Sequence, residues 1–111
     1  EEFRLSYDIF IFLLDISEKL SKMGGIISVI LFGSYAKLIY SEKSDIDLAV
    51  ILNDKIKNAE KTKKQIEKEI DKIEKNSRKK IEIHFFSKSD LKKGRKDPII
   101  DDILKNGKKL L

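Results

Sequence analysis

A glycine–serine pair followed by two alternating aspartates is the feature that most constrains how this chain can fold. Gly33 and Ser34 close one apolar run, ten residues follow, and Asp45 and Asp47 then alternate with apolar residues at the start of a second run. In a strand, side chains two residues apart point the same way and lie about 6.5 to 7 Å from each other. The pattern therefore predicts two apolar strands separated by a ten-residue connection, with a backbone turn at Gly33 and Ser34 and two carboxylates side by side at the start of the second strand.

The residue types in this pattern suit the handling of a phosphate group. Gly33 permits a positive φ angle and a close approach of phosphate to the backbone. Ser34 can donate its hydroxyl and cap a short helix that starts there. Asp45 and Asp47 offer two hard oxygen ligands of the kind that Mg²⁺ prefers. Either half of the pattern alone is common in turns and caps, but the two together, each beside an apolar run, indicate metal-assisted phosphoryl or nucleotidyl transfer.

At these residues the chain resembles the DNA polymerase beta nucleotidyltransferase superfamily, and more closely the minimal nucleotidyltransferases, the small antitoxin partners of HEPN-domain toxins. The family's Gly-Ser, ten-residue, Asp-x-Asp motif falls on Gly33, Ser34, Asp45 and Asp47. Its third carboxylate, on a later strand, is best matched by Glu82. The resemblance implies that the two aspartates are catalytic and, with Glu82, hold Mg²⁺, while the glycine–serine pair binds the nucleotide.

Two positions depart from the residues that are usual in the family. Many members have Arg-Gly where this chain has Lys37 and Leu38, and Asp where it has Glu82. Lys37 keeps a basic residue within one helical turn of Ser34, so we expect it to contact a phosphate of the nucleotide. The segment 97–107 also resembles the closing helix of the family, so the likeness extends over nearly the whole chain.

Hydrophobic periodicity predicts helices and strands in alternation. Apolar residues at spacings of three and four indicate a helix over 5–22 and a long amphipathic helix that opens at Asn53 and Asp54 and ends at Asn76. Apolar runs indicate strands over 26–32, 46–52 and 81–86. Short helices or turns are expected over 34–44 and after Ser87, and a last helix is expected with Asp97 as its cap, Pro98 at its first position and Gly107 at its end.

These elements predict the α/β (α+β) class. We expect a polymerase-beta-like nucleotidyltransferase fold, with a small mixed three- to four-stranded sheet and packed helices, in a single domain over residues 1–111. A chain of 111 residues suffices for one compact domain but not for two. The strands of Asp47 and Glu82 must be neighbours if their carboxylates are to share a metal, and the long helix between them suits such a connection.

The composition excludes several kinds of protein. The absence of cysteine excludes disulfides and thiolate metal sites and fits a reducing cytosol. The apolar stretch 9–14 is too short to span a membrane and lacks the features of a signal peptide, so we expect a cytoplasmic protein with no membrane partner. A net charge of +5 suits an anionic ligand such as ATP. Acidic residues interrupt the lysines of the long helix, so we expect a solvated face there and no nucleic-acid partner.

Four further residues merit attention. Glu82 and His84 should lie on one face of their strand, and without the resemblance Glu82 would be read as an exposed charge on an edge strand. His84 is the only histidine, and we expect it in an exposed or supporting position because carboxylates already suit hard magnesium. Tyr35 and Tyr40 fit a core position, stacking on a nucleotide or modification, and the sequence leaves these three roles open.

The resemblance also implies a biological role. It points to the antitoxin of a type VII-like HEPN/MNT pair, a magnesium-dependent adenylyltransferase that moves AMP from ATP to a tyrosine of a HEPN toxin within a hetero-oligomer. Too few residues follow the third strand to form an acceptor-binding domain, so we expect the acceptor on another chain. Two alternatives are a catalytically idle antitoxin that works by binding, and a nucleotidyltransferase acting on a small molecule or RNA. Base preference, acceptor, stoichiometry and the competence of Glu82 as third ligand are left open.

Overall fold

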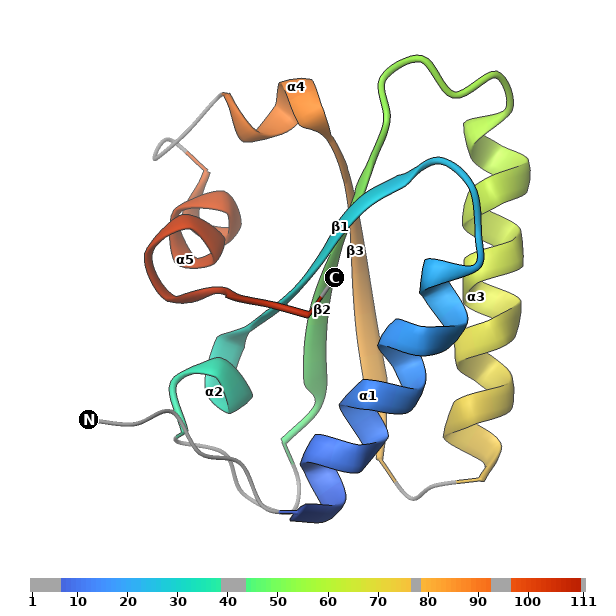
Figure 1. Cartoon of the computed structure of the whole chain (residues 1–111). Coiled ribbons are helices and arrows are strands. Elements are labelled where there is room, and N and C mark those ends of the chain that lie inside the picture. The colour runs from blue at the N-terminus through green and yellow to red at the C-terminus, as the bar shows by residue number, and fades with distance from the viewer. Residues whose placement is uncertain (1–6, 39–43, 77–78, 93–96, 111) are drawn as a thin grey trace.

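The order of helices and strands along the chain brings the strands of Asp47 and Glu82 into one sheet (Figure 1). The computed structural model describes residues 7–38, 44–76, 79–92 and 97–110. Their elements are α1 (Tyr7–Ser21), β1 (Ile26–Phe32), α2 (Gly33–Ala36), β2 (Ile46–Leu52), α3 (Ala59–Lys75), β3 (Ile81–Ser87), α4 (Lys88–Leu91), α5 (Pro98–Asn106) and β4 (Lys108–Lys109).

The sheet is mixed, as the sequence predicts, and has the strand order β3-β2-β1-β4. β1 runs antiparallel to both β2 and β4, whereas β2 and β3 are parallel and connected through α3. The register pairs Phe32 with Asp47 and Asp47 with Glu82. Asp47 therefore lies on a central strand, directly beside the strand that carries the second acidic residue.

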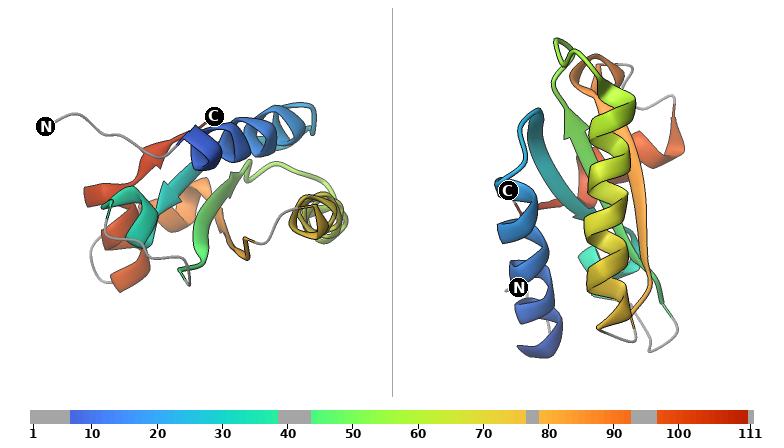
Figure 2. Two further views of the ribbon diagram at one scale, coloured as in Figure 1. Left: turned by 90° about the horizontal axis from the view of Figure 1, so that it is seen from below. Right: turned by 90° about the vertical axis from the view of Figure 1, so that its right-hand side faces the viewer.

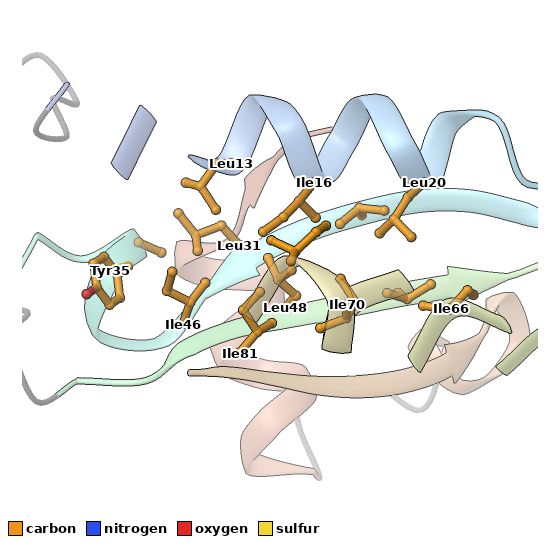
Figure 3. Close-up of a cluster of buried hydrophobic side chains, with 14 of the residues drawn as sticks. Leu13, Ile16, Leu20, Leu31, Tyr35, Ile46, Leu48, Ile66, Ile70 and Ile81 are labelled. Carbon is orange, nitrogen blue, oxygen red and sulfur yellow. The ribbon is translucent and has the colours of Figure 1, made fainter. Parts of the chain in front are cut away.

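The larger core lies between the sheet and the pair α1 and α3, which cover the same face (Figures 1 and 2). Isoleucine and leucine side chains from α1, α3 and the three longer strands meet there, and Tyr35 of α2 is fully buried among them (Figure 3). A smaller cluster on the opposite face, formed by Phe32, Ala49, Ile51 and Ile103, joins the sheet to α5, and Leu91 of α4 packs against it. Because both faces are covered, β1 and β2 read as nearly continuous apolar runs.

Several predicted boundaries agree with the structure. β1 and β2 have the predicted bounds, β3 is one residue longer, and α5 begins at Pro98 with Asp97 as its cap. The first helix ends at Ser21, one residue before the predicted end, and its predicted start at residue 5 lies outside the described residues. No helix among the described ranges is long and apolar enough to cross a membrane.

Two predicted starts are wrong. The long helix opens at Ala59 behind its cap Asn58, not at Asn53, because the Asn53 side chain accepts a hydrogen bond from the backbone N–H of Lys55 and closes a turn instead. The short helix α2 begins at Gly33 with Phe32 in the capping position and no side-chain cap. Ser34 therefore lies inside α2 and is not its cap.

Candidate active site at the start of β2

Three potential metal ligands converge on the sheet face that also carries α5. One ligand atom from each of Asp47, Glu82 and His84 lies within 4.8 Å of the other two. Asp47 comes from β2, and the other two residues alternate along β3, where the parallel register places Glu82 directly beside Asp47. The predicted closeness of the two strands is confirmed, and so is the common face of Glu82 and His84.

The electrostatics of Asp47 reflect this crowding. Burial raises the pKa of the Asp47 carboxyl, and the neighbouring carboxylates of Glu82 and Asp45 raise it further, whereas His84 acts in the opposite direction. A side-chain hydrogen bond with Glu82 also contributes to the raised pKa, because it favours the protonated form. The two carboxyl groups thus repel each other when both are ionised, and a bound cation would relieve this repulsion.

His84 is a member of this group, although its sequence context predicts an exposed or supporting position. Its Nε2 lies 3.8 Å from Oε1 of Glu82. The ring meets the edge of the Phe32 ring, with the two centroids 5.2 Å apart and the planes inclined by 67°. This aromatic contact orients the imidazole, and the nitrogen faces the carboxylates. The alternation of Glu82 and His84 along β3 is a sequence signal for this placement, but the approach to Asp47 depends on the register of two strands.

Asp45 lies one residue before the first residue of β2 and does not belong to the converging group formed by the described residues. The predicted side-by-side placement of Asp45 and Asp47 assumes that both lie in a strand, and the pairing of β2 begins only at Ile46. Asp45 is nevertheless close enough for its charge to raise the pKa of Asp47.

Gly33 lies in the turn and directly beside the carboxylate of Asp47. Its φ angle is +74°, in the left-handed region that favours glycine. A Cβ atom at this position would overlap the carboxylate of Asp47, whose Cγ would lie only 3.1 Å away. The positive φ angle was predicted for close approach of a phosphate. The structure adds a second reason for glycine, since its missing side chain leaves room for Asp47.

Lys37 is engaged by a residue far away in the sequence. Its Nζ lies 3.2 Å from Oδ1 of Asp102 on α5. The same carboxylate oxygen accepts a hydrogen bond of 2.9 Å from Nδ2 of Asn106, one turn further along α5. The predicted phosphate contact of Lys37 would therefore have to replace an existing ion pair, and Asp102 is a residue that sequence reasoning missed because no local pattern signals it.

The pKa of Asp102 shows how many donors surround its carboxylate. Burial by itself would raise this pKa, but hydrogen bonds from Asn106, Lys37 and the backbone of Gly33, together with the charge of Lys37, outweigh burial and lower it. The ionised carboxylate of Asp102 is thus stabilised by Lys37 and by the backbone of Gly33. These are the same groups that are expected to contact a phosphate.

The donor set of the converging group fits a divalent cation. Two carboxylates offer hard oxygen ligands, and a neutral imidazole suits several divalent metals. Burial and the neighbouring carboxylates both raise the pKa of Asp47, and a cation beside it would favour its ionised form. Such a group beside a turn with a positive φ angle can bring a metal and a phosphate into contact.

Comparison with known families shows to which family the chain belongs. The family described as "Polymerase beta, Nucleotidyltransferase" matches residues 15–111, which include all the residues of the candidate site. A comparison with curated protein sequences gives no match.

Solved structures with the same fold have low sequence identity. A protein of Sulfolobus solfataricus, provisionally assigned as a nucleotidyltransferase, is 16% identical with a TM-score of 0.56, and the match covers 92% of this chain and 78% of that one. A mutant of the toxin–antitoxin MntA-HpeT is 17% identical with a TM-score of 0.55, covering 96% and 73%. A toxin–antitoxin with AMP-PNP is 20% identical with a TM-score of 0.52 and the same coverage. At these identities the similarity establishes the fold.

Proposed function

Because the chain belongs to the polymerase beta nucleotidyltransferase family, we propose that it is the antitoxin of a HEPN/MNT pair and adenylylates a tyrosine of its toxin in a magnesium-dependent reaction. The observation that carries this proposal is the convergence of Asp47, Glu82 and His84 beside Gly33, because this group includes the second aspartate of the family motif and the residue that best matches its third carboxylate. Structural neighbours that are toxin–antitoxin complexes, one of them with AMP-PNP, support the choice of partner and nucleotide.

The reaction would proceed by substitution at the α-phosphorus of ATP. A tyrosine hydroxyl attacks this atom, the new O–P bond forms, and the bond to the β-phosphate oxygen breaks so that pyrophosphate leaves. The hydroxyl proton passes to water or to a carboxylate of the site. The turn at Gly33 and Ser34 would bind the phosphates, and Asp45, Asp47 and Glu82 would hold Mg²⁺. When bound, Mg²⁺ would neutralise charge on the phosphate oxygens.

Asp45 completes the proposed ligand set although it stands outside the converging group. It lies ahead of the first paired residue of β2, so its side chain is not fixed by the sheet. Its charge already influences Asp47, and a cation would attract it further. His84 is a fourth donor that could enter the set from β3.

The surface of α1 favours a protein partner. Four large apolar side chains of this helix are exposed, namely those of Tyr7, Phe10, Ile11 and Leu14. Contiguous apolar surface of this kind commonly marks a protein contact. The α1 surface therefore supports a contact with a second protein, made on the sheet face opposite to the converging group.

Transfer of label from ATP tests the proposal. The chain would be incubated with ATP labelled at the α-phosphate, Mg²⁺ and a helical HEPN protein encoded beside it. We expect label on the HEPN protein and none when its acceptor tyrosine is changed to phenylalanine. Asp47→Asn is the control, because it keeps the shape of the side chain but removes a proposed metal ligand, and it should give little label. Absence of label with a chain that binds both ATP and partner would reject adenylylation.

The catalytically idle antitoxin remains the second candidate because one observation favours it. Lys37 and the backbone of Gly33 are already engaged by Asp102, which leaves fewer groups for a nucleotide. An idle antitoxin would bind its toxin but give no heat on titration with ATP and Mg²⁺. Titration of the isolated chain therefore separates the two functions.

A further inference from the structure

Asp102 places a negative charge on the side of the molecule where the turn should receive a phosphate. Its carboxylate contacts Nζ of Lys37 at 3.2 Å and Nδ2 of Asn106 at 2.9 Å, and the backbone of Gly33 lies close enough to contribute to its lowered pKa. These donors come from two elements, α2 with its flanking Lys37 and α5, which contact each other. The side chain of Asp102 is 21% exposed and that of Lys37 is 40% exposed, so the pair is only partly shielded from solvent.

Two of these donors are groups that would bind a phosphate in the proposed reaction. A lysine ammonium and a backbone N–H in a glycine turn are typical phosphate contacts. A carboxylate and a phosphate oxygen use the same donors, so they cannot both be fully satisfied there. The Lys37 pair also joins residues far apart in the sequence, which ties α5 to the turn.

We propose that Asp102 is an internal anion of the nucleotide site, which holds Lys37 and the turn at Gly33 until a phosphate of the nucleotide displaces it. The inference rests on the proposed function, because it assumes that the phosphates of a nucleotide reach this turn. Asn106 remains with Asp102 during the exchange, since both belong to α5. Displacement then breaks the ion pair that links α5 to the turn. Because breaking this pair costs free energy, it lowers the affinity for the nucleotide.

Charge removal at Asp102 gives the first test. Asp102→Asn keeps the size of the side chain and an oxygen that can accept hydrogen bonds, but it removes the competing charge. We expect the Kd for ATP, measured by calorimetry, to fall by about three- to tenfold, since breaking a partly exposed ion pair before the phosphate can bind lowers the apparent affinity by about this factor. The matched control is Asp101→Asn on the same helix, because Asp101 pairs with Lys105 at 3.1 Å. The control should leave the Kd unchanged.

A double-mutant cycle with Lys37→Met distinguishes competition from a merely structural role. In the parent protein Lys37 is engaged by Asp102, so its removal should weaken ATP binding by less than about threefold. In the Asp102→Asn protein Lys37 is available, and the same removal should weaken binding by about tenfold. A structural role of Asp102 would give the same factor in both backgrounds.

The outcomes separate this inference from the proposed function. An unchanged or weaker affinity for ATP in Asp102→Asn, with an unchanged melting temperature, would overturn the internal anion. Inorganic tripolyphosphate provides an arm that does not depend on nucleotidyl transfer, with the amide signal of Gly33 in ¹⁵N NMR as the readout. If Asp102→Asn tightens tripolyphosphate binding and shifts this signal while label transfer fails, the internal anion stands and the proposed reaction falls. If the Kd values for tripolyphosphate are equal, the internal anion is rejected whatever the transfer assay gives.

Discussion

The two halves of the candidate site handle charge in opposite ways. At the strand side, Asp47 and Glu82 lie beside each other and burial and repulsion raise the pKa of Asp47. At the turn side, Lys37 and the backbone of Gly33 already meet the carboxylate of Asp102, whose pKa is lowered. A cation from outside the chain would therefore stabilise the strand side, whereas the turn side already has an anion from within the chain. A metal ion should therefore bind at the strand side without a competing cation, whereas a phosphate at the turn side should have to compete with Asp102.

The largest expected effect concerns the strand side. Asp47→Asn removes the charge that a metal would need, so AMP transfer should fall by about 10²- to 10³-fold. The metal-free variant should melt at a higher temperature than the parent, because one of two repelling carboxylates is gone. A radiolabel transfer assay and thermal denaturation measure the two effects. Full transfer activity in this variant would show that Asp47 holds no essential metal.

Gly33→Ala should break the connection between the two sides. The new Cβ would overlap the carboxylate of Asp47 and would stand at a positive φ angle. We expect a loss of about 1 to 3 kcal/mol in the free energy of unfolding, together with weaker binding of metal and nucleotide. Gly24→Ala is the matched control, because its Cβ would meet no atom within 4 Å. Equal stability of the two variants in urea denaturation would contradict this account of Gly33.

A smaller effect is expected for Glu82→Gln. Mg²⁺ at about ten times its Kd should stabilise the parent protein by about 1.4 kcal/mol, or several degrees in melting temperature. Glu82→Gln should shrink this increment and lower transfer, while the metal-free variant should be slightly more stable. Thermal denaturation with and without Mg²⁺ measures the increment. A variant with the full increment and full activity would place the third ligand elsewhere.

The smallest expected effects are opposite pH dependences of stability in the metal-free protein. The pKa of Asp47 is raised above its ordinary value of 3.8, so the stability that it contributes is present below pH 3.8 and is lost as the pH rises through the raised pKa. The pKa of Asp102 is lowered, so its contribution is present above pH 3.8 and is lost as the pH falls through the lowered pKa.

Denaturation across the acid range would compare each Asn variant with the parent. The stability difference should change by less than about 1 kcal/mol in either case. Relative to its variant, the parent should lose stability with rising pH for Asp47 and gain stability for Asp102. Slopes of the same sign would remove the contrast between the two sides.

Local patterns predicted most of the strand side. The bounds of β1 and β2 follow from continuous apolar runs, and the neighbouring strands of Asp47 and Glu82 follow from the helix between them. The closeness of His84 to Asp47 depends on the parallel register of β2 and β3, which no local sequence pattern predicts. Site roles for Asp45, Asp47, Gly33, Ser34, Lys37 and Glu82 stay predictions.

Contacts between distant residues account for what the sequence did not predict. The pair of Lys37 with Asp102 joins α5 to the turn, and neither residue stands in a pattern that indicates the other. The strand β4 has only two residues, both lysines, so it lacks the apolar alternation by which strands are recognised. Asp54 likewise bonds with Ser89 across 35 residues, outside the helix that it was expected to open.

The two borders of the sheet have a consequence for self-association. At one border β4 presents only Lys108 and Lys109, and lysines discourage the addition of a foreign strand. At the other, no described strand pairs with the outer side of β3, whose seven residues include neither lysine nor proline. Glu82 is the only acidic residue of β3, so its charge would keep two copies apart at this border. A cation that neutralises Glu82 would also weaken this protection, and concentrated protein should be most prone to edge-to-edge aggregation when metal is present.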